Sequence, residues 1–410
     1  MRIRAPMYRD FLAGRNCPNW FEEVENMLVN AIIRWRSHVL WCTVLSSTVG
    51  FWGGLHVAVG YAAPAISVVQ GAVSNGSPVI ISGSGFGATG PNVVFFDDFE
   101  KGTHGSPISI SPGSASFGQW GQLDSNPPRY SNAFAFSGNM SYVSDWSNNG
   151  ASEGGRWAAA TFNGTNQVYF SFWTYLPTNR VVPGTSNIGA NWKWVEISRN
   201  PLSGSDYTSV FLTDFPPRDG TWQTPNPWYD AAGLSETGYG NHTSIIKGRW
   251  HRYEYFFLGS SSGSGIIQMW ELNSSTPRTI ICNKTNLTNL HSHDLWGLVR
   301  LSAYGRGDAN SQTYHDDFYI ATGPGARARV EIGNSSSYSS STNLAVATVT
   351  SWSDTQVVAT IRQGSFQPGQ AAYLYVVDSS GAVNSQGYPL TIGGGAAVSV
   401  PETPSALTVR

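Results

Sequence analysis

The chain has 410 residues, a net charge of −2, only 12% charged residues and 13% aromatic residues, with 45 Gly and 16 Trp. Few charges, many turn-forming residues and many large aromatic side chains are typical of an extracellular all-β protein and argue against a helical cytosolic one. Nucleic-acid binding needs clustered Lys and Arg, which this charge balance does not supply. We therefore expect no nucleic-acid partner.

The N-terminal region differs from the rest of the chain. Arg34 and Arg36 precede the apolar run Val39–Leu55, and small residues follow it up to Pro64. This order of basic, apolar and small residues predicts a signal peptide region over residues 1–63, with a membrane anchor as the alternative. We expect a secreted protein, extracellular or on the cell surface, that has no membrane contact after cleavage.

Two distant segments show the same sequence pattern, in which short runs of alternating apolar residues are separated by tight turns. They are SNGSPVIISGSGFG at 74–87 and, much later, WSDTQVVATI at 352–361 with AYLYVVDSSGAVNSQGY at 372–388. Together they resemble the start and the end of an IPT/TIG domain, a small immunoglobulin-like β sandwich. The resemblance implies a spacer or binding scaffold and no chemistry.

About 240 residues lie between the two halves of this domain, which predicts a domain inserted into a surface loop. We expect the immunoglobulin-like domain to comprise residues 64–94 and 328–394, the insert to span 95–327, and residues 395–410 to form a disordered tail.

The insert shows no sustained helical periodicity and many strand-like runs between Gly, Ser, Asn and Pro loops, so we expect a β sandwich or jelly roll. The predicted strands are Gln167–Leu176, Trp192–Arg199, Thr208–Phe215, Trp250–Leu258, Ile266–Leu272 and Leu298–Tyr304.

Three segments of the insert, GRWHRYEYFFLG at 248–259, GIIQMWELN at 265–273 and GLVRLSAYGRG at 297–307, resemble concanavalin A-like jelly rolls. This is the fold of laminin-G-like modules and of several polysaccharide lyases. The resemblance implies a concave sheet that binds a glycan. The whole chain is then all-β, with a concanavalin A-like jelly-roll sandwich inserted into an immunoglobulin-like one.

Alternation along four strands separates a polar and aromatic face from an apolar one. Indole rings stack on the C–H faces of sugars, and charged side chains hydrogen-bond their hydroxyls, so such a face suits a polysaccharide partner. The predicted groove is lined by Trp194, Glu196, Arg252, Glu254, Gln268, Trp270, Arg300 and Tyr304, with Arg306 as a further substrate contact.

Cleavage of a uronic-acid chain by β-elimination needs a group that neutralises the carboxylate and a base that removes the C5 proton. Arg300 and Tyr304 fit these roles, with Gln268 or Arg252 as the neutralising group. A glycoside hydrolase that uses Glu196 and Glu254 is an alternative.

Two further alternatives involve no catalysis: a carbohydrate-binding or adhesion module, and a structural component of a surface or virion. An ordinary solvated face with cross-strand Arg–Glu pairs would show the same alternation. The oligomeric state is not predicted.

An acidic motif occurs twice, as FFDDFE at 95–100 and as YHDDFYI at 314–320. We expect these to be neighbouring strands that open and close the insert. Hard cations prefer several carboxylates, so Asp97, Asp98, Asp316 and Asp317 predict a structural Ca²⁺ site, with turn capping as the alternative. No organic cofactor is expected.

Overall fold

The computed structural model describes the chain from residue 63 onwards, with gaps. The predicted signal region and C-terminal tail lie outside the described residues. Backbone alone is described for 153–154, 192–194, 209–214, 226–229 and 304–306. The described ranges are 63–147, 153–179, 192–201, 209–214, 226–229, 246–306 and 311–394.

The described residues form β strands and one short 3₁₀ helix, Tyr338–Ser340 (η1), so the all-β prediction is confirmed. Within these residues, no helix is long and apolar enough to cross a membrane.

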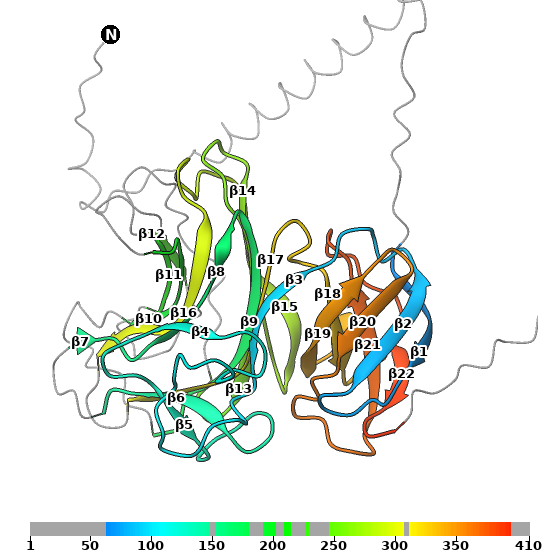
Figure 1. Cartoon of the computed structure of the whole chain (residues 1–410), viewed down its shortest axis with the longest axis horizontal. Coiled ribbons are helices and arrows are strands. Elements are labelled where there is room, and N and C mark those ends of the chain that lie inside the picture. The colour runs from blue at the N-terminus through cyan, green and yellow to red at the C-terminus, as the bar shows by residue number, and fades with distance from the viewer. Residues whose placement is uncertain are drawn as a thin grey trace, which may run out of the picture. The chain divides into compact units, whose positions relative to one another are not determined.

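Strands from both ends of the described chain pair in one seven-stranded sheet, in the order β1-β2-β20-β19-β18-β21-β22. Apolar residues of these strands fill one core, and we call the unit that they form the terminal sandwich. Pro78 of β2 pairs with Thr360 of β20, so the blue strands in Figure 1 lie among the orange and red ones. About 270 residues therefore separate two strands that are hydrogen-bonded neighbours. The strands are β1 (Ala65–Gln70), β2 (Pro78–Ser84), β18 (Arg329–Gly333), β19 (Leu344–Trp352), β20 (Gln356–Thr360), β21 (Ala371–Val377) and β22 (Tyr388–Thr391).

The residues between β2 and β18 form a two-sheet sandwich. We call one layer the proximal sheet, because its outer face packs on the terminal strands; its order is β15-β14-β13-β9-β17-β6-β5, with β3 beside β17. Its strands are β3 (Asn92–Asp97), β5 (Arg129–Ser131), β6 (Ser141–Asp145), β9 (Gln167–Tyr175), β13 (Trp250–Leu258), β14 (Gly265–Asn273), β15 (Thr276–Leu287) and β17 (Gln312–Thr322).

The other layer, the distal sheet, has the order β12-β11-β10-β16-β8-β4, with β7 beside β16 (Figure 1). All six strands expected in the insert are present, within about two residues of their predicted ends. The distal strands are β4 (Trp120–Leu123), β7 (Glu153–Gly154), β8 (Ala158–Thr165), β10 (Trp192–Ser198), β11 (Ser209–Asp214), β12 (Asn226–Tyr229) and β16 (Trp296–Arg306).

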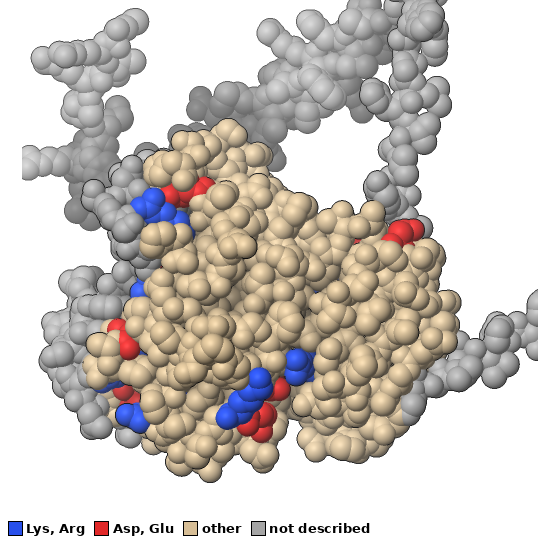
Figure 2. All heavy atoms as spheres, in the orientation of Figure 1, with Lys and Arg blue, Asp and Glu red and all other residues tan. Residues whose placement is uncertain are grey.

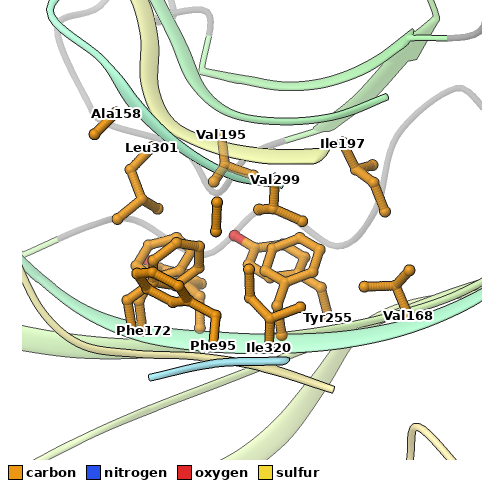
Figure 3. Close-up of a cluster of buried hydrophobic side chains, with 14 of the residues drawn as sticks. Phe95, Ala158, Val168, Phe172, Val195, Ile197, Tyr255, Val299, Leu301 and Ile320 are labelled. Atoms are coloured by element: carbon orange, nitrogen blue, oxygen red, sulfur yellow. The ribbon is translucent and has the colours of Figure 1, made fainter. Parts of the chain in front are cut away.

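The core of the sandwich lies between these two sheets. Figure 3 shows Phe172 and Tyr255 of the proximal sheet facing Val195, Val299 and Leu301 of the distal sheet. All five side chains are fully buried, and burial of each such side chain stabilises the fold by roughly 1.5–3 kcal/mol. Because alternate residues of each strand fill this core, their neighbours must point outward, away from the opposite sheet.

The centre of the outer face of the proximal sheet is buried. Phe256 of β13 and Trp270 of β14 belong to one apolar cluster with Val330 and Leu374 of the terminal sandwich. The two sandwiches therefore share a buried interface. This leaves the outer face of the distal sheet as the face that the terminal strands do not cover.

Charged side chains are scarce and lie in small separate groups on the face drawn in Figure 2. This agrees with the charged fraction of only 12%. Any pocket that gathers several charges is therefore a local departure from the rest of the surface.

Candidate functional site

The predicted groove is divided between two sheets. Arg252, Glu254, Gln268 and Trp270 lie on β13 and β14 of the proximal sheet, whereas Glu196 and Arg300 lie on β10 and β16 of the distal sheet. Each set points away from the core between the sheets, so the two sets point in opposite directions. The prediction of one shared groove is wrong, because alternation identifies faces but not which sheet a strand joins.

Arg252 and Glu254 belong to a buried ion network under the terminal sandwich. Arg252 is 1% exposed, and its Nη2 lies 2.5 Å from Oε1 of Glu331 on β18. Glu254 is fully buried and pairs with Arg278 at 3.0 Å and with Arg329 at 3.5 Å. Arg252 and Glu254 help to join the two sandwiches and are at most 1% exposed, so they cannot line an open glycan groove.

The charges of this network keep its carboxylates ionised. Burial alone would raise the pKa of Glu254, but the guanidinium groups of Arg278, Arg252 and Arg329 lower it to about 2. Glu331 is held below its usual pKa in the same way by Arg329 and Arg252, against burial. Tyr338 donates to Glu331 Oε2 at 2.6 Å and completes the set of partners.

Trp270 is 8% exposed and packs in the same interface, where the guanidinium of Arg278 lies 4.3 Å from the centre of its ring. Gln268 donates from Nε2 to Oδ1 of Asn283 on the neighbouring strand, at 2.9 Å. Trp270 is therefore an interface residue, and Gln268 lies on the proximal sheet, away from Arg300.

The outer face of the distal sheet carries a compact group of side chains that can bind a sugar. Glu196 and Arg300 are directly opposite each other on β10 and β16, and Arg300 Nη2 lies 2.5 Å from Glu196 Oε2. The guanidinium of Arg300 also lies 4.5 Å from the centre of the Trp157 ring. Glu196 is 1% exposed while 13% of the Arg300 side chain is exposed, so a buried carboxylate orients the guanidinium of a partly exposed side chain.

Polar side chains continue along this face beyond β8. Gln122 of β4 donates from Nε2 to Oδ1 of Asn200 at 3.0 Å. The face thus combines an indole, amides and a guanidinium, which are the groups that stack on sugar rings and hydrogen-bond their hydroxyls.

Trp157 and Gln122 were missed from the sequence. Trp157 stands in GGRWAAAT, and Ala158, Ala159 and Ala160 after it give no polar and apolar alternation. Ala158 and Ala160 face the core, so Ala159 points outward. The residues of this strand alone do not indicate that it belongs to the distal sheet. The one available signal is an aromatic residue directly before a small-residue strand.

Trp194, Tyr304 and Arg306 are placed by their backbone only, and their side chains lie outside the description. Tyr304 pairs with Lys193, but the register with β10 shifts between this pair and Leu301–Val195. The shift adds one residue to β16 near Ser302, which has φ +54 and hydrogen-bonds the buried His315 at 3.0 Å. A bulge interrupts the alternation of side chains along a strand. The spacing of four residues between Arg300 and Tyr304 therefore does not show that their side chains lie on the same face of the sheet.

A second aromatic group lies on the proximal sheet. Phe134 is 37% exposed and stacks on Tyr175 at 4.5 Å between ring centres, and Tyr175 contacts Trp250 at 5.4 Å. In this group the rings stack on one another, which occupies much of the ring surface that a sugar would need.

The two acidic motifs lie on neighbouring strands, as expected, because β3 and β17 pair antiparallel. Asp316 accepts hydrogen bonds from the backbone N–H groups of Phe136, Ser137 and Asp317, at 2.8 to 3.0 Å. Asp97 accepts from the Phe99 N–H and from Trp120 Nε1. Both carboxylates therefore hold backbone turns in place.

Asp98 and Asp317 line a small pocket of about 110 Å³ with Glu100 and Arg362. Ser116 donates to Asp98, and Ser137 donates to Asp317 at 2.8 Å. Among the described residues, no three His, Cys, Asp or Glu side chains are arranged to hold a metal ion. The Ca²⁺ site stays a prediction.

Burial raises the pKa of Asp97 and Asp317 to about 7 each, in spite of their hydrogen bonds. Asp98 adds to the effect on both, because its charge repels theirs. Burial and the adjacent Asp317 also raise the pKa of Asp316 well above its usual range. The cluster therefore takes up protons near neutral pH.

No family model matches this chain, and no curated protein matches it. Several solved structures are similar to part of this chain. They include the endo-β-1,4-glucuronan lyase of Trichoderma reesei, at 10% identity over 57% of this chain and 96% of that chain, with a TM-score of 0.36. The alginate lyase of Aplysia kurodai matches at 11% identity over 57% and 100% of the two chains, with a TM-score of 0.38.

The catalytic domain of a glycoside hydrolase family 131 protein from Coprinopsis cinerea is also similar, at 13% identity over 57% and 95% of the two chains, with a TM-score of 0.32. At such identities and TM-scores, these likenesses say nothing about the activity of this chain. The evidence for its function comes from its own side chains.

Proposed function

We propose that the protein binds a polysaccharide chain across the outer face of the distal sheet. The observation that carries the proposal is the group formed by Trp157, Arg300 and Glu196 on the face that the terminal sandwich leaves uncovered. An indole next to an oriented guanidinium offers stacking to a sugar ring and charged hydrogen bonds to its substituents. Gln122 and Asn200 extend the same face for neighbouring sugar units.

Uronic-acid chains are the substrates that this face fits best, and β-elimination is the proposed reaction. Arg300 would neutralise the uronate carboxylate, which makes the C5 proton easier to remove. Tyr304, opposite Lys193 on the neighbouring strand, is the proposed base. As its phenolate takes the C5 proton, the C4–C5 double bond forms and the C4–O bond breaks, and the leaving oxygen takes up a proton from water. The hydrolase alternative with Glu196 and Glu254 is wrong, because these carboxylates lie on different sheets and point in opposite directions, so they cannot flank one glycosidic bond.

Binding without cleavage is the second candidate, and one observation favours it. Glu196 already neutralises Arg300 at 2.5 Å, which weakens the attraction of this guanidinium for a second carboxylate. In that case the face would serve attachment to a glycan at the cell surface or outside the cell.

A panel of polyuronates, sulfated glycans and neutral glucans distinguishes these functions. Ultraviolet absorbance of an unsaturated uronate together with new reducing ends indicates a lyase, and retention on a glycan column without either indicates a binding module. Reducing ends without absorbance would contradict elimination. If Tyr304→Phe retained full lyase activity, Tyr304 would not be the base.

A further inference from the structure

A pocket of about 380 Å³ lies between the terminal sandwich and the insert, where β19 and β3 approach each other (Figure 1). We call it the junction pocket. Its volume falls within the range of roughly 300–1,000 Å³ that small-molecule sites occupy, and such sites are common at domain junctions. Its lining comes from residues 90–93 and Phe117 on the side of the insert and from residues 349–352 at the end of β19.

None of the described residues that line the junction pocket is charged. The charged residue closest to them in the sequence is Asp354, whose Oδ1 accepts from the Gly87 N–H at 2.9 Å and which does not line the pocket. A charged ligand would lose part of its hydration in this pocket without gaining an opposite charge. The pocket therefore favours an uncharged ligand.

Two aromatic side chains give the junction pocket apolar surface at fixed positions. Trp352 packs on the backbone of Gly90, since a side chain on this glycine would come within 2.3 Å of the Trp352 Cβ and Cγ atoms, and its Nε1 donates to the Gly87 carbonyl oxygen at 2.8 Å. Two hydrogen bonds with Phe96, at 2.8 and 3.0 Å, hold the backbone of Phe117, whose side chain is 37% exposed. An exposed ring beside a fixed indole suits the C–H face of a sugar.

Uncharged polar side chains accompany these rings. The Asn92 amide donates from Nδ2 to Thr322 Oγ1 at 2.9 Å, which orients the amide and leaves its oxygen as an acceptor. Thr350 and Ser351 are exposed and add two hydroxyl groups, which can both donate and accept. These groups match the hydroxyls of a neutral sugar.

One edge of β19 is open beside the junction pocket. β18 pairs with β19 only from Leu344 to Ala347, and among the described strands no other pairs with this edge at residues 349–352. Its backbone groups can hydrogen-bond a ligand without adding charge. The register with β20 shifts between Val349 and Ser351, and such a bulge disfavours pairing with a further strand. The edge therefore favours a compact ligand with several hydroxyls over an extended peptide.

We infer that the junction pocket binds an uncharged sugar unit, which stacks on Phe117 and hydrogen-bonds Asn92 and the end of β19. The inference goes beyond the proposed function, because it concerns a second site with another class of ligand and does not rest on the glycan face. A ligand in this pocket contacts both sandwiches. The terminal sandwich then takes part in binding and is more than a spacer.

Calorimetric titration of the whole protein with cellobiose, maltose, xylobiose, mannobiose and digalacturonate tests the site. We expect at least one of the neutral disaccharides to bind. Phe117→Ala should weaken binding of that disaccharide about tenfold, because it removes one stacking contact. The same variant should leave any binding of digalacturonate unchanged.

Phe134→Ala is the matched control, because Phe134 is also 37% exposed but stacks on Tyr175 of the proximal sheet. It should keep the wild-type affinity for the neutral disaccharide. Thermal melting followed by circular dichroism checks that both variants fold. If Phe117→Ala does not fold, Ser351→Phe, which fills the pocket from an exposed position, should abolish binding instead.

Three results would overturn the site: no binding of any neutral disaccharide, equal affinities of Phe117→Ala and Phe134→Ala, or binding of digalacturonate that depends on Phe117. A hexapeptide of alternating Val and Thr tests strand addition in the same titration. Binding of this peptide in place of the disaccharides would overturn the assignment to a sugar.

Trp157→Ala separates this result from the proposed function. If Trp157→Ala abolishes binding of the neutral disaccharide while Phe117→Ala keeps it, the glycan face stands and the junction pocket fails. If the wild type is not retained on any polysaccharide column but still binds the disaccharide in a Phe117-dependent manner, the junction pocket stands and the proposed function fails.

Discussion

The outer faces of the two sheets carry the same kinds of residues but serve different purposes. On the proximal sheet, Arg252 and Glu254 are at most 1% exposed and pair with charges of the terminal sandwich. On the distal sheet, Arg300 pairs with Glu196 on the neighbouring strand, and 13% of its side chain is exposed. A strand face of alternating Arg, Glu and Trp can therefore form a domain interface or a binding site, and what packs on the sheet decides which.

The largest expected effect comes from breaking the interface network. Glu331→Leu removes the carboxylate that holds both Arg252 and Arg329, at 2.5 and 3.0 Å, and leaves two buried guanidiniums short of a partner. We expect a loss of about 3–5 kcal/mol in the free energy of unfolding, measured by urea denaturation. Asp354→Asn, at an exposed turn, should change it little, and a loss below about 1 kcal/mol in Glu331→Leu would show that the network does not join the sandwiches.

The acidic cluster should make stability depend on pH. In the unfolded chain, Asp97 and Asp317 lose their protons near pH 4, whereas in the folded protein their pKa is about 7. The folded state therefore binds more protons between these values, so the free energy of unfolding should fall as pH rises from about 4 to about 7.

Asp317→Asn removes one of these titrating groups and relieves its repulsion with Asp98. The decrease in stability between pH 4 and 7, followed by urea denaturation at several pH values, should become shallower in this variant. An unchanged slope would contradict the raised pKa of Asp317.

Most of the fold could be predicted from the sequence, because strand alternation and turn residues are local signals. The pairing of β3 with β17 was predicted from the repeated acidic motif. The sheet to which each strand belongs depends on long-range pairing, which alternation does not encode. For that reason Arg252 and Glu254 were placed in the same groove as Arg300.

The candidate site could be predicted only in part. Glu196 and Arg300 were placed on one face, and they are cross-strand partners. Trp157 precedes an alanine-rich strand without alternation, so no periodic signal marks it. The bulge at Ser302 depends on a hydrogen bond to His315 of the opposite sheet, which no local pattern could reveal.

A smaller effect is expected from removing the aromatic contact on the distal sheet. Trp157→Ala should lower affinity for polysaccharide about tenfold, since the loss of one stacking and cation–π contact costs on the order of 1–2 kcal/mol. Affinity electrophoresis in glycan-containing gels measures this. Phe134→Ala, on the proximal sheet, is the matched control and should keep the wild-type mobility.

The smallest expected effect is that of calcium. Backbone N–H groups and serine hydroxyls already donate to the four aspartates, so we expect EDTA and added Ca²⁺ to change the melting temperature little. A melting temperature that falls with EDTA and recovers with Ca²⁺ would instead establish the calcium site that the sequence predicts.

Hydroxyl-radical footprinting with and without a bound polysaccharide tests the central claim most directly. It compares the oxidation of Trp157 on the distal sheet with that of Phe134, which is 37% exposed on the proximal sheet. We predict that the glycan protects Trp157 and leaves Phe134 unchanged. Protection of Phe134 with unchanged oxidation of Trp157 would contradict the assignment of the glycan face to the distal sheet.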